Sequence, residues 1–222
     1  MLVRIPDVLS PEQLARFRAQ LEAATWVDGR ETAGPLAAAV KRNRQLARTD
    51  PLAARLGEEL LARLNENPVF VAAALPAAVM PPTFNRYDGG EAYGTHVDNA
   101  IQVVDGGLLR ADVAATVFLS NPADYDGGEL VVEDTYGAHA VRLAAGEMIL
   151  YAAGSRHHVA PVTRGTRLAA IFWIQSMVRD EGSRTLLFEL DAAIRGAAAG
   201  DGAAVVRLSG VYQALVRRWA EP

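Results

Sequence analysis

Residues 69–176 alternate short β-rich runs with turn signals, and this pattern constrains the fold more than any other feature of the chain. The turns include Asp88-Gly89-Gly90 and Asp126-Gly127-Gly128, where paired glycines interrupt the runs. Many short strands at this spacing are typical of an all-β sandwich or barrel. The strands that we predict are residues 83–87, 112–120, 129–134, 140–143, 147–152, 157–162 and 167–176.

Helix signals precede this β-rich segment. Ser10-Pro11-Glu12-Gln13 predicts a helix start, with Ser10 as N-cap, proline at the first helical position and Gln13 completing a capping box. Asp50-Pro51 repeats the signal, and leucines at helical spacing follow until Asn67-Pro68 ends the helix. Residues 29–48, between the two helices, are rich in small and basic side chains, and we predict a strand or a loop there.

Two further helical stripes follow the β-rich segment. Apolar side chains recur at helical spacing over residues 180–194 and again over residues 208–219. We predict a mainly β fold with flanking helices, the N-terminal helices being packed outside the β structure. We expect one domain over residues 1–178 and a small C-terminal helical appendage over residues 179–222, through whose helices any oligomer would form.

Composition excludes several classes of function. The chain carries 22 Lys and Arg against 26 Asp and Glu, whereas nucleic-acid-binding proteins normally carry a basic excess, so we expect no nucleic-acid partner. The absence of cysteine excludes disulfides, thiol nucleophiles, iron–sulfur clusters and cysteine-based zinc sites. The N-terminus lacks a signal-peptide pattern, and the most apolar stretch, residues 69–80, is shorter than the roughly 20 residues of a bilayer span. We therefore expect a cytoplasmic protein with no membrane partner.

Two candidate metal ligands come from one short motif. His96-Val97-Asp98 places an imidazole and a carboxylate two residues apart, and such positions on a strand point to one face. The two groups would then converge on one point inside the barrel. The alternative interpretation is a surface histidine beside an acidic residue. The chain has three other histidines, of which we interpret His139 as a solvated turn residue.

A second element supplies a third nitrogen ligand. It begins with His157-His158 and ends, ten residues after His157, at Arg167 on the returning strand. Two histidines and one carboxylate on one face suit non-haem Fe(II) and leave three coordination positions open. A bidentate 2-oxo acid could take two of these positions and dioxygen the third. The far carboxylate of 2-oxoglutarate needs a fixed, forked and always-charged donor, and arginine suits that task.

With these motifs the chain resembles the Fe(II)/2-oxoglutarate-dependent dioxygenases, specifically the bacterial PKHD-type (prolyl/lysyl hydroxylase-type) hydroxylases. The pattern Tyr-x-x-Gly-x-x-Tyr-x-x-His-x-Asp is present as Tyr87, Gly90, Tyr93, His96 and Asp98. The pattern His-x-Val-x-Pro-Val-x-x-Gly-x-Arg runs from His157 to Arg167. The likeness extends through nearly the whole chain, including the C-terminal helical appendage.

The resemblance implies a double-stranded β-helix, or jelly roll, with iron held by His96, Asp98 and His157. It also implies that Arg167 binds 2-oxoglutarate. The family's reaction splits 2-oxoglutarate into succinate and carbon dioxide and adds a hydroxyl group to a carbon of the primary substrate, with ascorbate as the usual reductant. Since the halogenating relatives lack the carboxylate ligand, Asp98 indicates hydroxylation.

Several of these residues have a second interpretation. Tyr87 and Tyr93 are candidate contacts to 2-oxoglutarate, but barrel tyrosines also occur as packed core residues. Adjacent residues on a strand face opposite ways, so only one of His157 and His158 can point inward, and the motif register selects His157. We interpret Trp173 as a core residue.

Two other functions would use the same jelly roll. A cupin-like metalloenzyme would not need Arg167, and its metal ligands would be richer in histidine. An iron- or ligand-binding module would be expected to have a broken triad. For the primary substrate, the sequence leaves a protein side chain and a small metabolite open. We expect residues 30–48 and 99–110 to form loops that gate the pocket, because substrate choice often resides in loops.

Overall fold

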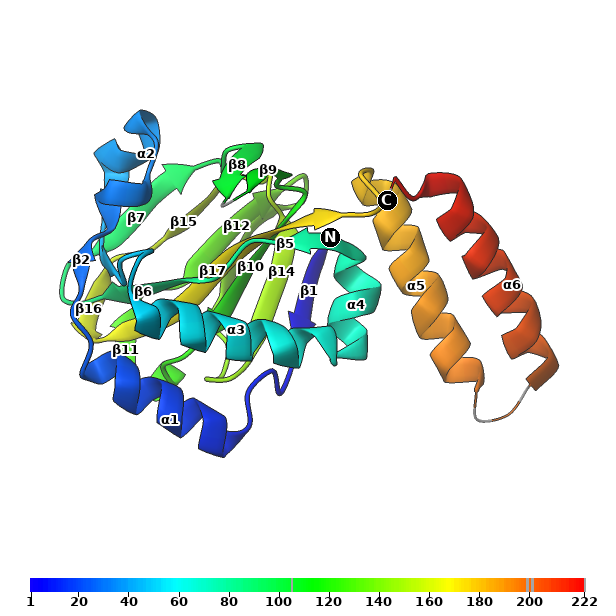
Figure 1. The fold of residues 1–222 in the computed structure, drawn as a ribbon, viewed down its shortest axis with the longest axis horizontal. Helices are drawn as coiled ribbons and strands as arrows, with labels where there is room; N and C mark the ends of the chain where they lie inside the picture. Colours follow the sequence, from blue (N-terminus) through cyan, green and yellow to red (C-terminus); the bar gives the residue numbers. More distant parts are fainter. Residues whose placement is uncertain (105, 199, 201, 222) are drawn as a thin grey trace.

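Two antiparallel sheets form the body of the molecule, and helices lie along one side of it and extend from one end (Figure 1). The computed structural model describes residues 1–104, 106–198, 200 and 202–221. The predicted mainly β fold with flanking helices is confirmed. The β structure is a two-sheet sandwich, the arrangement of a jelly roll.

The larger sheet forms one layer of the sandwich and contains eight strands. Its order is β1 (Leu2–Ile5), β14 (Met148–Ala152), β10 (Val113–Phe118), β17 (Arg167–Ser176), β6 (Thr83–Tyr87), β4 (Arg44–Gln45) and β2 (Val27–Asp28), with β5 (Pro76–Val79) paired to β17. The longest strand, β17, pairs with both β10 and β6, and Arg167 is the register partner of Tyr87.

The smaller sheet faces the larger one. Its order is β13 (Gly137–Val141), β12 (Leu130–Asp134), β15 (His157–Val159), β7 (Ala92–His96) and β3 (Lys41–Arg42). Two further pairs lie outside these sheets: β11 (Tyr125–Gly127) with β16 (Val162–Gly165), and β8 (Ile101–Val104) with β9 (Gly107–Arg110). The central pairing of β7 with β15 makes His96 and His157 register partners.

The helices begin where the capping residues predict. The Ser10 hydroxyl accepts from the Gln13 backbone N–H at 3.2 Å, and the Gln13 side chain accepts from the Ser10 N–H at 2.9 Å. The Asp50 carboxylate accepts from the Leu52 N–H at 2.8 Å. The helical elements are α1 (Pro11–Glu22), η1 (Gly29–Thr32), α2 (Pro35–Val40), α3 (Pro51–Asn65), α4 (Pro68–Ala74), η2 (Pro122–Asp124), α5 (Glu181–Ala197) and α6 (Gly202–Trp219).

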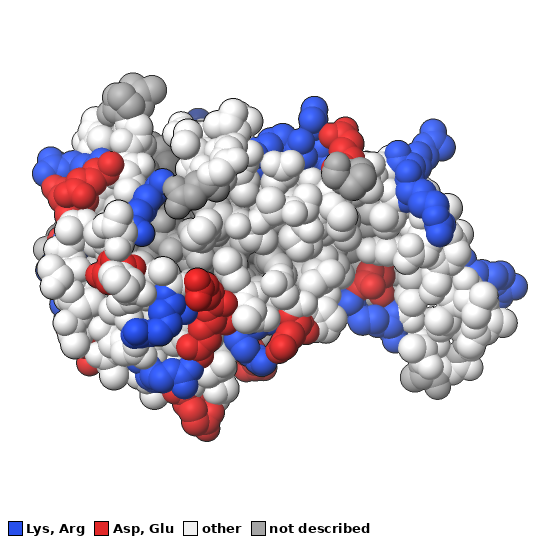
Figure 2. Space-filling model, viewed as in Figure 1, with Lys and Arg blue, Asp and Glu red and all other residues white. Residues whose placement is uncertain are grey.

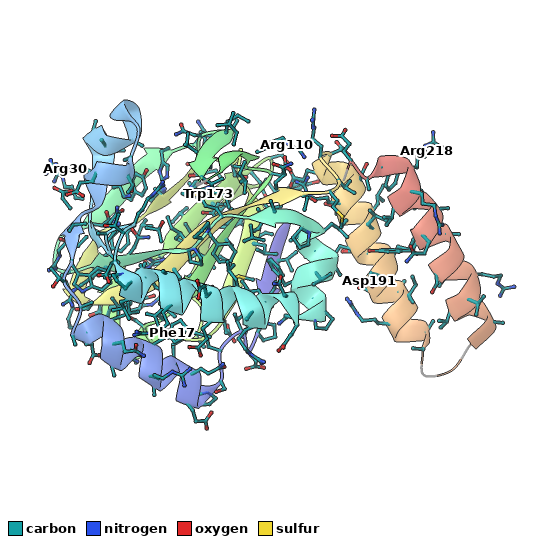
Figure 3. The ribbon with its side chains drawn as sticks, viewed as in Figure 1. Phe17, Arg30, Arg110, Trp173, Asp191 and Arg218 are labelled. Atoms are coloured by element: carbon teal, nitrogen blue, oxygen red, sulfur yellow. The ribbon has the colours of Figure 1, made fainter. Side chains whose placement is uncertain are left out.

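Helices α1 and α3 pack on the larger sheet and form the main hydrophobic core with it. Phe17 of α1, labelled in Figure 3, lies between the two helices and is fully buried, with its ring centre 6.4 Å from that of Phe84 on β6. Leu60 of α3 and Phe172 of β17 belong to the same core. Burying one such side chain contributes about 1.5–3 kcal/mol. Because β17 turns alternate side chains toward these helices, its other face is left for the interior of the sandwich.

The C-terminal helices form a hairpin at the end of the molecule away from α2 (Figure 1). A separate, smaller core joins this hairpin to the body through Leu75, Val178 and Leu187. The buried guanidinium of Arg184 donates to the carbonyls of Val178 at 2.8 Å and Arg179 at 2.6 Å. The predicted helices over residues 180–194 and 208–219 are confirmed.

On the face that Figure 2 shows, basic and acidic side chains lie interspersed. Arg16 of α1 forms an ion pair with Glu59 of α3, which ties the two helices together. Among the described residues, none of the helices combines the length and the apolar character that a membrane span requires.

Several details of the predicted secondary structure are wrong. Residues 69–74 belong to helix α4, because the Asn67 side chain, which was expected only to end a helix, caps a new one by accepting from the Val69 and Phe70 N–H groups. The predicted strand 157–162 is two strands, β15 and β16, separated at Pro161, which has no N–H to donate to a ladder. Strand β7 was not among the predicted strands, although the expected convergence of His96 and Asp98 assumed a strand at residues 96–98.

The two segments expected to be gating loops contain regular structure. Residues 30–48 include most of η1 together with α2, β3 and β4. Residues 99–110 form the β8–β9 hairpin, with residue 105 lying outside the described residues. Both segments nevertheless contribute residues to the cavity described below, among them Lys41 and Gln102.

Candidate active site

Three potential metal ligands meet at the end of β7. His96 is the last residue of β7, His157 is the first residue of β15, and Asp98 follows β7 by two residues. The Asp98 Oδ1 atom lies 3.8 Å from Nε2 of His96 and 3.8 Å from Nε2 of His157. These separations are too long for hydrogen bonds and fit ligand atoms that each lie about 2 Å from a shared ion. The expected strand from 96 to 98 ends at His96, so convergence depends on the irregular segment after β7 rather than on strand alternation.

Backbone carbonyls orient both imidazole rings. With its hydrogen on Nδ1, His96 donates to the Gly94 carbonyl at 2.9 Å, and His157 donates to the Ser155 carbonyl at 3.0 Å. These bonds leave each Nε2 lone pair facing Asp98. Holding the second ring nitrogen in this way is how proteins usually fix the tautomer of a metal-binding histidine.

The electrostatics of this cluster favour a bound cation. Burial, followed by the neighbouring His157, lowers the pKa of His96 to about 4. Burial raises the pKa of the Asp98 carboxyl, an effect that His157 and then Trp173 oppose. A divalent cation would stabilise the Asp98 carboxylate and use the imidazoles in their neutral form. Two nitrogens and one carboxylate oxygen match the ligand preference of non-haem Fe(II), so the residues fit that metal.

Arg167 lies in the same cavity as the three ligands and is only 2% exposed. Its guanidinium carbon is 5.3 Å from the ring centre of Tyr87 and 5.3 Å from that of Phe118. Among the residues that the structure describes, no carboxylate forms an ion pair with it, and its buried Nε has no hydrogen-bond partner. A buried guanidinium without a counter-charge is costly unless an anion binds there.

The two tyrosines of the first motif also line the cavity. Tyr87 is 4% exposed, and burial raises its pKa while Arg167 opposes the increase. Tyr93 stacks on the His96 ring with centres 3.7 Å apart, and burial raises its pKa as well. Tyr87 therefore lies beside the unpaired cation, and Tyr93 lies beside the metal ligands.

Sequence reasoning assigned no site role to several residues of the cavity wall, among them Trp173, Tyr151 and Lys41. Trp173, labelled in Figure 3 and interpreted above as a core residue, lines the cavity and influences Asp98. Its even spacing from Arg167 along β17 was the available signal. Tyr151 of β14 lies edge-on to His157 with ring centres 5.1 Å apart. Lys41 enters the wall from β3, a strand too short to be recognised in the sequence.

The remaining histidines lie elsewhere. His158 is half-buried, is the register partner of Val131 on β12, and is absent from the cavity wall. His139 lies on strand β13 rather than in the turn where we expected it, and its Nε2 is 3.0 Å from Asp134 Oδ2. The structure therefore brings together His96, Asp98, His157, Arg167, Tyr87 and Tyr93, and it leaves His139 and His158 outside that group.

Two family models match the chain in consecutive segments. The model described as 2OG-Fe(II) oxygenase superfamily matches residues 82–175, which hold all six of these site residues. The model described as PKHD-type hydroxylase C-terminal domain matches residues 181–221, which form the α5–α6 hairpin.

Curated relatives match over their full length. A PKHD-type hydroxylase of Shewanella sp. (strain ANA-3) is 52% identical, and one of Burkholderia thailandensis is 53% identical, with all of both chains covered in each case. Among solved structures, a Pseudomonas putida prolyl-4-hydroxylase has a TM-score of 0.54 at 19% identity, covering 79% of this chain and 92% of that one. HygX from Streptomyces hygroscopicus, with nickel, 2-oxoglutarate and hygromycin B bound, has a TM-score of 0.55 at 19% identity, covering 79% and 82%. The structural likeness concerns the fold.

Proposed function

Because the chain belongs to the PKHD-type hydroxylases of the 2OG-Fe(II) oxygenase superfamily, we propose that His96, Asp98 and His157 hold its iron and that Arg167 binds 2-oxoglutarate. The protein is a 2-oxoglutarate-dependent dioxygenase that couples hydroxylation of a primary substrate to decarboxylation of 2-oxoglutarate to succinate. The observation that carries the residue assignment is that one cavity contains both the ligand triad and a buried, unpaired arginine.

Ferrous iron, when bound, supplies the coordination sites and the redox chemistry that dioxygen activation needs. The Gly94 and Ser155 carbonyls keep the Nδ1 hydrogens of His96 and His157 in place, so that both Nε2 atoms remain free as ligands. Asp98 supplies the negative charge of the site, and its side chain is 8% exposed, so the carboxylate is largely shielded from water.

Arg167 serves the cosubstrate through its fork of N–H groups. A carboxylate bound there would receive charge-assisted hydrogen bonds and neutralise a cation that otherwise stays buried alone. Tyr87, whose ring centre lies 5.3 Å from the guanidinium carbon, is placed to contact the same carboxylate. Tyr93, stacked on His96, is placed to contact the cosubstrate at the metal end of the cavity.

The alternatives that the sequence left open receive no comparable support. A cupin-like metalloenzyme would have no use for a buried arginine in the metal cavity, and the triad of an iron- or ligand-binding module would not need to be intact. Ascorbate as reductant, the cytoplasmic location and assembly through the C-terminal helices stay predictions. We also propose that residues 1–178 form the catalytic unit and residues 179–222 its helical appendage, since a separate small core joins the two.

The test of this assignment measures metal content, cosubstrate binding and succinate release on protein purified without oxygen. The wild-type protein should bind one Fe(II) per chain and release succinate from 2-oxoglutarate in air. His96→Ala and Asp98→Ala should each lose most of the metal affinity, because each removes one of three ligands. His139→Ala is the matched control, since this exposed histidine also faces an aspartate. Wild-type iron binding by both triad variants would show that the metal is held elsewhere.

A further inference from the structure

Lys41 is the single lysine of the chain, whose other basic side chains are all arginines. It lies on β3 and is 5% exposed, although lysine is among the residues least often buried. Its side chain lines the cavity that contains the triad. Burying an ammonium group costs free energy, which either a counter-charge within the protein or a bound anionic ligand would offset.

The position of Lys41 relative to the triad follows from strand pairing. Lys41 is the register partner of Tyr93, and its Nζ lies 5.4 Å from the centre of the Tyr93 ring. Tyr93 in turn stacks on His96. Arg167, by contrast, belongs to the other sheet of the sandwich. The Tyr93 ring therefore lies between Lys41 and the proposed metal ligand His96. Lys41 lies on a different wall of the cavity from Arg167, the proposed 2-oxoglutarate residue.

The ammonium group of Lys41 has neutral partners. It donates to Gln45 Oε1 at 3.3 Å and to Thr32 Oγ1 at 3.5 Å. Within the described part of the chain it forms no ion pair with a carboxylate. Asp28 and Asp98 are close enough to raise its pKa, but Asp28 is paired with Arg30 and Asp98 belongs to the triad. An ammonium group has three donors, so at least one direction stays open to a ligand.

A second cation lies near Lys41. Arg48 is exposed, lines the same cavity, and joins burial in lowering the pKa of Lys41 to about 8. Two positive side chains that repel each other in a cavity wall mark a place where an anion would be stabilised.

The charges of the loaded cavity leave a positive excess. Among the Lys, Arg, Asp and Glu side chains that line it, three are cationic and only Asp98 is anionic. A divalent metal ion and doubly negative 2-oxoglutarate cancel each other. The excess therefore persists when both are bound, at the wall formed by Lys41 and Arg48.

We propose that Lys41, supported by Arg48, binds an oxyanion group of the primary substrate, so that this hydroxylase acts on an organic anion bearing a carboxylate or a phosphate. The inference rests on the proposed function, because it takes the metal and 2-oxoglutarate to occupy the triad and Arg167. It places the anionic end of the substrate beside Tyr93, within the same cavity as the metal.

The rim of the cavity indicates that the rest of this anion is apolar. Val97 lines the cavity and is 50% exposed, and the adjoining β8–β9 hairpin exposes Ile101, Val103 and Leu108. An aromatic acid is therefore a suitable probe. Benzoate and phenyl phosphate present the two oxyanions on the same ring, and benzamide is the neutral counterpart of benzoate.

The experiment uses the full chain loaded with Zn(II) and saturating 2-oxoglutarate, so that no turnover occurs. Calorimetric titration should give measurable affinity for benzoate or phenyl phosphate and at least tenfold weaker binding of benzamide. Lys41→Met should weaken the oxyanion about tenfold to a hundredfold, as expected for one charge-assisted hydrogen bond, and leave the dissociation constant of 2-oxoglutarate unchanged. Arg42→Met is the matched control, since this neighbouring β3 cation is exposed and lies outside the cavity wall.

A second measurement needs no variant. Reductive methylation with ¹³C-formaldehyde labels Lys41 and the N-terminal amine, and the Lys41 methyl groups give the only lysine NMR signal because the chain has no other lysine. Saturable displacement of this signal by benzoate or phenyl phosphate, but not by benzamide, supports the proposal. Equal binding of benzoate and benzamide, undisturbed oxyanion affinity in Lys41→Met, or a loss of 2-oxoglutarate affinity in that variant overturns it. If the loaded wild-type protein binds no 2-oxoglutarate at all, the proposed function fails instead.

Discussion

The guanidinium carbon of Arg167 lies 5.3 Å from the ring centre of Tyr87, and the two residues are register partners on β17 and β6. Strand pairing therefore fixes a buried, unpaired cation of the cavity wall against an aromatic ring. The ring contacts the cation without neutralising it, which leaves the guanidinium available to a carboxylate.

Arg167→Leu should leave metal binding intact and weaken 2-oxoglutarate by about 2–5 kcal/mol, because a buried carboxylate loses its charged partner. Titration with 2-oxoglutarate under nitrogen measures the effect. Arg164→Leu is the control, since Arg164 is exposed on β16 and pairs with Asp126 at 2.6 Å. An unchanged dissociation constant in Arg167→Leu would assign the cosubstrate to another cation. Arg86 is a poor substitute because Asp88 already pairs with it at 2.9 Å.

Substitutions of the adjacent residues His157 and His158 should have different effects on metal binding and activity. His157→Ala should lose metal and succinate production, because its Nε2 faces Asp98 at 3.8 Å. His158→Ala should keep iron and most of the activity, since His158 is not part of the cavity wall. Metal analysis and succinate assays on both variants decide the matter. An inactive, iron-free His158→Ala beside an active His157→Ala would reverse the assignment.

Gly165, in the motif that leads to Arg167, should tolerate no side chain. Its φ is +72°, and a Cβ atom there would lie 2.0 Å from the Asp124 carbonyl oxygen. Gly165→Ala should therefore lower the free energy of unfolding by about 2 kcal/mol or more. Gly154→Ala is the matched control, because nothing lies within 4 Å of its Cβ position, and its effect should stay within about 0.5 kcal/mol. Denaturant unfolding of the ligand-free proteins compares the two, and equal stabilities would refute the steric argument.

Lys41 should make the stability of the ligand-free protein rise with pH. The pKa of Lys41 is about 8 in the folded protein against an ordinary value of 10.5. Between these pH values the unfolded chain binds more protons than the folded one, so raising the pH destabilises the unfolded state relative to the folded state. The free energy of unfolding of the wild type, relative to Lys41→Met, should increase by up to about 3 kcal/mol from pH 8 to pH 10.5. Urea unfolding across this range measures the difference. A flat difference would mean that Lys41 keeps its ordinary pKa.

The sequence by itself determined the β class and the chemistry of the site. Glycine turns fix short strands locally, and Ser10 and Asp50 cap helices through neighbouring backbone groups, so both signals lie within a few residues. The site residues are also recognisable locally. One gapped motif contains His96 and Asp98, and a second contains His157 and Arg167.

Only the tertiary structure decided how these pieces meet. The pairing of β7 with β15 sets His96 opposite His157, and the pairing of β3 with β7 brings Lys41 to the cavity wall from far upstream in the chain. Such contacts depend on which strands become neighbours and in what register, and no local propensity encodes that choice. For the same reason a lysine in a basic segment looks like a surface residue until the fold buries it.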